Sequence, residues 1–162
     1  SHGVWAAKEQ IQEAITLVSA QRADPKHQKK LAQVKVRREA KETVFGEDFQ
    51  QAIIQFLNFD QKHHLLVEQL SKLVKEHAVP VGSGTVARSS SVTLEDKAAL
   101  AVMAWMRHQT SAYDSTPVAR VKGARRELRR QIARQSERIL AKYSSGEDFD
   151  FGGCALYKAL HG

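Results

Sequence analysis

The chain has 162 residues, of which 42% are hydrophobic and 27% are charged, a composition typical of a globular protein. Its longest apolar run, Ala98 to Met106, is about half of what a bilayer span requires, so we expect no membrane partner and a cytoplasmic location. Lys and Arg outnumber Asp and Glu by 25 to 18, which favours a polyanionic ligand. The single cysteine, Cys154, excludes an internal disulfide, and we expect it to pack as a small apolar side chain.

Residues 1–46 are predicted to form a basic helical arm. Apolar residues from Val4 to Val18 recur at helical spacing and predict a first amphipathic helix of about four turns. Asp24 and Pro25 then have the residue types of an N-cap and a first helical position. The next stretch, 26–45, is helix-prone but poor in apolar residues, so we expect it to protrude until Gly46 breaks it.

Residues 47–146 are predicted to form the helical core domain, and residues 147–162 a short C-terminal tail. Predicted caps at Asp48, Asp60 and Thr93, together with glycines and prolines, separate stretches with apolar residues at helical spacing. The stretch after Thr93 is apolar on nearly every side, so we expect its helix to lie centrally. The predicted helices cover residues 48–57, 60–80, 93–106 and 124–143, with a short one over 155–160. Loops are predicted over 81–91 and 110–122, and Trp5 and Trp105 are expected in the core. Because no useful period-two alternation is present, we predict an all-α fold, a single compact multi-helix domain.

The positive charge is concentrated in two blocks. Residues 22–41 contain eight Lys or Arg against two acidic residues, and residues 120–142 contain nine against two. Arg126 and the arginines that follow it every four residues cover one side of the last predicted helix, opposite its apolar face. Glu127 and Glu137 neutralise too little of this charge, so we expect these arginines to be unpaired. A guanidinium group can bind two phosphate oxygens at once, so this helix predicts phosphate binding, with a solvated charged face as the alternative.

We therefore predict a surface that contacts the phosphates of nucleic acid. The predicted contact residues are Arg107, Arg120, Lys122, Arg125, Arg126, Arg129, Arg130, Arg134, Arg138, Lys30, Arg37 and Arg38. Double-stranded DNA is slightly favoured over RNA, because a helix that follows a loop can enter a major groove; a DNA-binding protein would be nucleoid-associated. An adaptor that recognises an acidic protein is a further alternative.

A second group of polar residues follows the central predicted helix. His108, Tyr113 and Asp114 are the candidate catalytic residues of a nuclease or other phosphoryl-transfer enzyme, in which Asp114 orients His108 while Arg107 and Lys122 hold phosphate. A helix C-terminus explains the same residues: His108 interacts with the helix dipole or the last carbonyls, Asp114 or Ser115 makes a turn, and Tyr113 packs. We favour this second interpretation, with phosphate contact without catalysis between the two, and assign no catalytic activity.

Neither a metal nor a cofactor is predicted. His63 and His64 are adjacent and point to different sides of a helix, and no cysteine pair is present, so a zinc site is not expected. The Gly82 to Thr85 segment lacks the lysine and hydroxyl residue that end a nucleotide-binding loop. A small-molecule ligand is therefore not expected either, and the sequence predicts no oligomeric state.

Three segments resemble a known family. Residues 82–88, 105–114 and 120–127 are similar, in this order, to the Gly-Ser-Gly-x-Val-x-Arg, Trp-x-Arg-His-Gln-Thr-Thr-x-Tyr-Asp and Arg-Val-Lys-Gly-x-Arg-Arg-Glu segments of the bacterial branch of the domain of unknown function 2293. Ser111 stands where that family usually has Thr. The resemblance extends over most of the chain, implies membership but no activity, and leads us to expect that the natural chain begins before Ser1.

Overall fold

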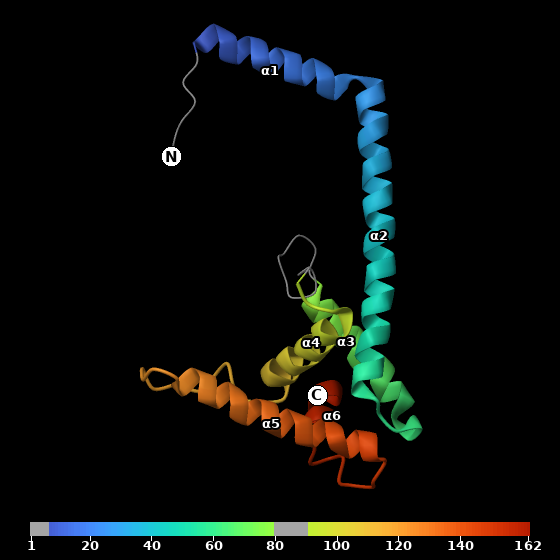
Figure 1. The fold of residues 1–162 in the computed structure, drawn as a ribbon, viewed down its shortest axis with the longest axis vertical. Helices are drawn as coiled ribbons and strands as arrows, with labels where there is room; N and C mark the ends of the chain where they lie inside the picture. Colours follow the sequence, from blue (N-terminus) through green and yellow to red (C-terminus); the bar gives the residue numbers. More distant parts are fainter. Residues whose placement is uncertain (1–6, 80–90) are drawn as a thin grey trace. The chain divides into compact units, whose positions relative to one another are not determined.

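The computed structural model describes residues 7–79 and 91–162, and every regular element in these ranges is a helix, as the sequence predicted (Figure 1). None of these helices combines the length and apolarity that crossing a bilayer requires. The chain divides into two units, Ser1–Val44 and Phe45–Gly162. Trp5, Pro80 and all but the last residue of the predicted loop over 81–91, including its Gly82 to Thr85 segment, lie outside the described residues.

The first unit contains α1 (Lys8–Ala23) and the first part of α2 (Pro25–Leu57). The Asp24 carboxylate accepts a hydrogen bond from the Lys26 N–H at 2.9 Å, and Pro25 is the first residue of α2, as predicted. No residue of α1 is buried, and apolar side chains such as Ile15, 52% exposed, face solvent. The apolar face predicted for α1 therefore has no buried contact within the described part of the chain.

Helix α2 continues through Gly46, so the predicted break, and with it the predicted cap at Asp48, was wrong. A glycine inside a helix costs only about 1 kcal/mol relative to alanine. Packing beyond Gly46 outweighs that cost: the Phe45 ring stacks on Phe49 with centroids 5.8 Å apart, and Phe49 and Ile53 are fully buried. Tertiary contacts here override a local propensity that the sequence alone shows.

The second unit is completed by η1 (Gln61–His63), α3 (His64–Ala78), α4 (Leu94–Gln109), α5 (Ala124–Ser145) and α6 (Ala155–His161). Two predicted caps are confirmed. The Asp60 carboxylate accepts from the Lys62 N–H at 3.0 Å before η1, and the Thr93 hydroxyl accepts from the Asp96 N–H at 3.2 Å before α4. These caps fix where the chain enters η1 and α4.

Helix α4 lies at the centre of the second unit and packs against α3, α5 and α6. Its central place was predicted from a sequence that is apolar on nearly every side, and Trp105 is buried as expected. The largest buried side chains of the core come from α2 to α6 and are Phe49, Ile53, Leu57, Leu70, Val74, Val102, Trp105, Met106, Leu140, Tyr143 and Leu156. This packing holds the end of α4 and most of α5 in place.

The C-terminal segment, residues 147–162, is packed into the same core. The rings of Phe149 and Phe151 lie 5.0 and 6.0 Å from the ring of Tyr143, and Leu156 of α6 is fully buried. The Tyr143 hydroxyl donates to Cys154 Sγ at 3.4 Å, and burial raises the pKa of Tyr143. The half-buried Cys154 matches its predicted packing role.

Candidate functional site

The beginning of α5 extends outward from the core. Gly123, the residue before the helix, has φ +93°, a left-handed conformation that glycine adopts at little cost. The first eight residues of α5 bury no side chain, because the buried residues begin only at Ile132. The backbone N–H groups of the first turn, which form the positive end of the helix dipole, therefore lie away from the core.

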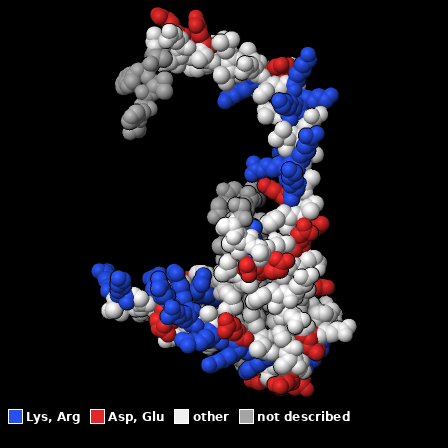
Figure 2. All heavy atoms as spheres, in the orientation of Figure 1, with Lys and Arg blue, Asp and Glu red and all other residues white. Residues whose placement is uncertain are grey.

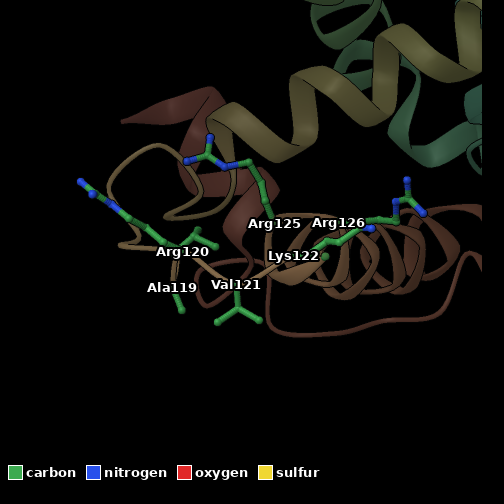
Figure 3. A pocket seen from close by; sticks show the side chains of 8 residues that line it. Ala119, Arg120, Val121, Lys122, Arg125 and Arg126 are labelled. Atoms are coloured by element: carbon green, nitrogen blue, oxygen red, sulfur yellow. The ribbon is translucent and has the colours of Figure 1, made fainter.

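An open cavity of about 640 Å³ lies at this end of α5 (Figure 3). Eight residues line it: Val118, Ala119, Arg120, Val121, Lys122, Gly123, Arg125 and Arg126. Four of them are cationic and none is acidic. Figure 3 shows that Arg120 and Arg126 diverge to either side, whereas Arg125 is directed toward the end of α4.

The arginines along α5 differ in how they are paired. Arg134 Nη2 and Arg130 Nη1 lie 3.2 and 3.6 Å from the Glu127 carboxylate, so the prediction that these two arginines are unpaired was wrong. Arg126 and Arg138 have no ion pair within the described ranges, as predicted. Exposed pairs of this kind contribute only about 0–1 kcal/mol, so an anionic ligand can replace Glu127 as the partner.

Helix α5 and the loop before it carry the densest cluster of basic side chains visible on the second unit (Figure 2). The helix itself contains seven Lys or Arg and two Glu, and Arg120 and Lys122 lie directly before it. We call the cationic side chains from Arg120 to Arg138 the α5 surface. It joins the cavity at the helix start to the arginine face farther along the helix.

The His108–Asp114 pair lies where α4 ends. His108 Nδ1 is 2.9 Å from both carboxylate oxygens of Asp114, and its ring packs edge-on against Tyr113 with centroids 5.6 Å apart. His108 lies in the last turn of α4, as expected for a residue that interacts with the helix dipole, but its ring nitrogen bonds Asp114 and not the last carbonyls. The backbone carbonyls of Met106 and Arg107 accept hydrogen bonds from the hydroxyls of Thr110 and Ser111, at 2.7 and 2.6 Å.

Tyr113 is surrounded by arginines. Arg129 Nε donates to the phenolic oxygen at 2.8 Å, and the guanidinium carbons of Arg107 and Arg129 lie 5.3 and 5.9 Å from the ring centroid. This hydrogen bond lowers the pKa of Tyr113, and the charges of Arg129, Arg125 and Arg107 act in the same direction. Arg107 Nε is buried without a hydrogen-bond partner in the described part of the chain.

The comparisons with known proteins give one match. The model of a family described as uncharacterized conserved protein (DUF2293) matches residues 59–144, just over half of the chain. The chain belongs to this family. No curated protein and no solved structure matches significantly. The DUF2293 region contains α3, α4, the His108–Asp114 loop and nearly all of α5, and so includes the whole α5 surface.

The remaining predicted contact residues lie in the first unit, outside the DUF2293 region. At 100° per residue, Lys26, Lys30, Arg37 and Lys41 fall within about 60° of one another on α2. We call these four residues the α2 basic stripe. Arg38, the other contact residue predicted in this helix, lies on another side of it and pairs with Glu42 at 3.1 Å, so it is not part of the stripe.

Potential metal ligands are dispersed. No group of three or more His, Cys, Asp or Glu side chains that could hold a metal ion occurs in residues 7–79 and 91–162. His63 is buried and His64 is exposed, so these neighbours face different surroundings.

Proposed function

We propose that this DUF2293 protein binds nucleic acid by contacting its phosphates with the α5 surface. The observation that carries the proposal is the cavity at the start of α5, which four cationic side chains and no acidic side chain line. Backbone N–H groups and the dipole at a helix N-terminus also favour anions. The two contributions act at the same place and have the same sign.

The length of the α5 surface supports a polymer over a single small anion. From Ala124 to Arg138 the helix rises about 21 Å, at 1.5 Å per residue. A row of cations of this length can contact several phosphates of one strand and release their counterions. The projecting first two turns of α5 also support duplex DNA over RNA, because recognition helices enter a major groove by their N-terminal residues.

A charge-neutralised variant, Lys122→Gln with Arg126→Gln, tests the proposal. Fluorescence anisotropy with a labelled duplex, measured at several salt concentrations, should show weaker binding and a slope of log K against log salt that is smaller by about two. The matched control, Lys72→Gln with Lys158→Gln, removes the same charge from exposed positions on α3 and α6. An equal loss in both variants would contradict a defined contact surface. Parallel titrations with duplex DNA and duplex RNA rank the two ligands.

A second candidate function, phosphoryl transfer, is favoured by the His108–Asp114 geometry. When His108 Nδ1–H donates to Asp114, the Nε2 lone pair remains available as a general base. We expect any cleavage of plasmid DNA or structured RNA, assayed with Mg²⁺ and with Mn²⁺, to be lost in His108→Ala while duplex binding is retained. Cleavage that persists in His108→Ala would exclude His108 as the base.

A further inference from the structure

The arginines around Tyr113 form a second site next to the cavity at the start of α5, and Arg125 contributes to both. Tyr113 holds the Arg129 side chain by its Nε, which leaves both Nη atoms of that guanidinium without a protein partner in the described ranges. Arg107 is held differently: its Nε is enclosed, its guanidinium lies over the Tyr113 ring, and its Nη atoms are not enclosed. Both guanidinium groups are thus oriented by contacts that leave their terminal nitrogens available.

The charge of this cluster is unbalanced. Arg107, Arg125 and Arg129 supply three positive charges around Tyr113, and Arg125 is directed toward the end of α4 (Figure 3). Asp114, the neighbouring carboxylate, is bonded to His108. An excess of two positive charges remains when His108 is neutral. Because like charges repel, an anion bound among these guanidinium groups would lower the energy of the cluster.

We propose that the Arg107–Tyr113–Arg129 cluster binds a phosphomonoester, the doubly charged phosphate group found at the end of a nucleic-acid strand. The inference rests on the proposed function, since it assigns to one part of the nucleic acid a site of its own. A phosphomonoester carries a charge of about −1.5 to −2 at pH 7 and has three acceptor oxygens, whereas a diester within the strand carries about −1. The two forks from Arg107 and Arg129 match the doubly charged group.

The test compares two labelled duplexes that differ only in a 5′-phosphate or a 5′-hydroxyl end. The intact protein should bind the phosphorylated duplex about tenfold more tightly, the gain expected from one charge-assisted pair. Arg107→Gln should abolish this preference. Tyr113→Phe should reduce it severalfold, because the ring remains but Arg129 loses the hydroxyl that orients it. A duplex with a 3′-phosphate shows whether either end of a strand is accepted.

Two controls separate this site from the rest of the α5 surface. Arg138→Gln should weaken the binding of both duplexes equally and leave their ratio unchanged, because Arg138 lies about two and a half turns beyond Arg129 on α5. Inorganic phosphate should remove the preference while the hydroxyl-ended duplex stays bound, relative to chloride at equal ionic strength. Circular dichroism identifies any variant that fails to fold, and Arg129→Lys then replaces Arg107→Gln with the same expected loss.

The outcomes for the site and for the proposed function are distinguishable. Equal binding of the phosphate-ended and hydroxyl-ended duplexes by the intact protein overturns the phosphomonoester site and leaves nucleic-acid binding in place. Binding of neither duplex overturns the proposed function. A preference that persists in Arg107→Gln and Tyr113→Phe places the end-recognition elsewhere and also overturns the inference.

Discussion

The two units hold their basic residues in different ways. In the described part of the first unit no side chain is buried, so the α2 basic stripe is ordered only by its own helix. In the second unit α5 is fixed by buried Ile132, Leu140 and Tyr143, and Arg129 is oriented by Tyr113. Preorganised donors bind with less loss of side-chain entropy and with defined geometry. We therefore expect the α2 basic stripe to attract any nucleic acid, whatever its sequence. We expect the α5 surface, with Arg129 oriented by Tyr113, to distinguish one kind of phosphate group from another.

The largest difference between the units should appear in stability. Tyr143→Ala should lower the free energy of unfolding by about 3–5 kcal/mol, because it leaves a cavity among buried aromatic side chains. Leu17→Ala in α1 should change it by less than about 0.5 kcal/mol, since Leu17 is 66% exposed. Urea unfolding followed by circular dichroism measures both. A comparable loss from Leu17→Ala would show that α1 packs against something in solution.

Neutralising the α2 basic stripe should affect binding without affecting stability. The fourfold change of Lys26, Lys30, Arg37 and Lys41 to Gln should weaken duplex binding by about tenfold or more at moderate salt, with a smaller salt slope. The preference for a phosphate-ended duplex should stay, because the stripe lies outside the cluster that orients Arg129. Lys35→Gln with Arg38→Gln is the control, since these residues pair with Glu39 and Glu42. If the slope of log K against log salt is unchanged in the fourfold variant, the α2 basic stripe does not contact the duplex.

Much of the fold was predictable because it depends on short-range patterns. Apolar spacing located the helices, and local capping chemistry located the starts at Pro25 and Leu94. The prediction failed at Gly46, where burial of Phe49 and Ile53 outweighs a local propensity. It also understated the C-terminal segment, whose Phe149 and Phe151 rings pack on Tyr143.

The candidate site was predictable in composition but not in arrangement. The sequence showed an arginine face on the last helix, and the exposure of Arg126 and Arg138 agrees with it. It did not show that Glu127 pairs with both Arg130 and Arg134, because only Arg130 lies at the i,i+3 spacing of neighbouring turns and Arg134 follows seven residues after Glu127. The Tyr113–Arg129 hydrogen bond joins residues 16 positions apart across an irregular loop. No helical periodicity reports a contact of that kind.

Two glycines should respond in opposite directions to the same substitution. Gly46→Ala should raise the free energy of unfolding by about 0.5–1 kcal/mol, because the residue is helical and an added Cβ would have nothing within 4 Å. Gly146→Ala should lower it by about 1 kcal/mol or more, because φ is +69° and the new Cβ would lie 2.7 Å from Asp60 Oδ2. Thermal unfolding compares them. Destabilisation by Gly46→Ala would indicate that residue 46 is not helical in solution.

The smallest effect should be a pH dependence that belongs to the second unit. His63 lies against the rings of Tyr143 and Phe151, its Nε2 is buried without a hydrogen-bond partner among the described residues, and burial lowers its pKa below 6.5. Lys62 lowers it further, while Asp60 and Asp148 act in the opposite direction. The unfolded chain therefore binds a proton that the folded chain excludes as the pH falls below about 6.5.

The free energy of unfolding should thus decrease from pH 6.5 down to the folded pKa of His63 and show no further change from this residue below it. In His63→Phe, which keeps an aromatic ring in the same surroundings but cannot be protonated, this part of the pH dependence should disappear. Urea unfolding of both proteins across that range measures the difference. If the free energy of unfolding changes equally with pH in the two proteins, His63 is protonated as easily in the folded chain as in the unfolded one. The aromatic surroundings of His63 would then be more open to water than its burial indicates.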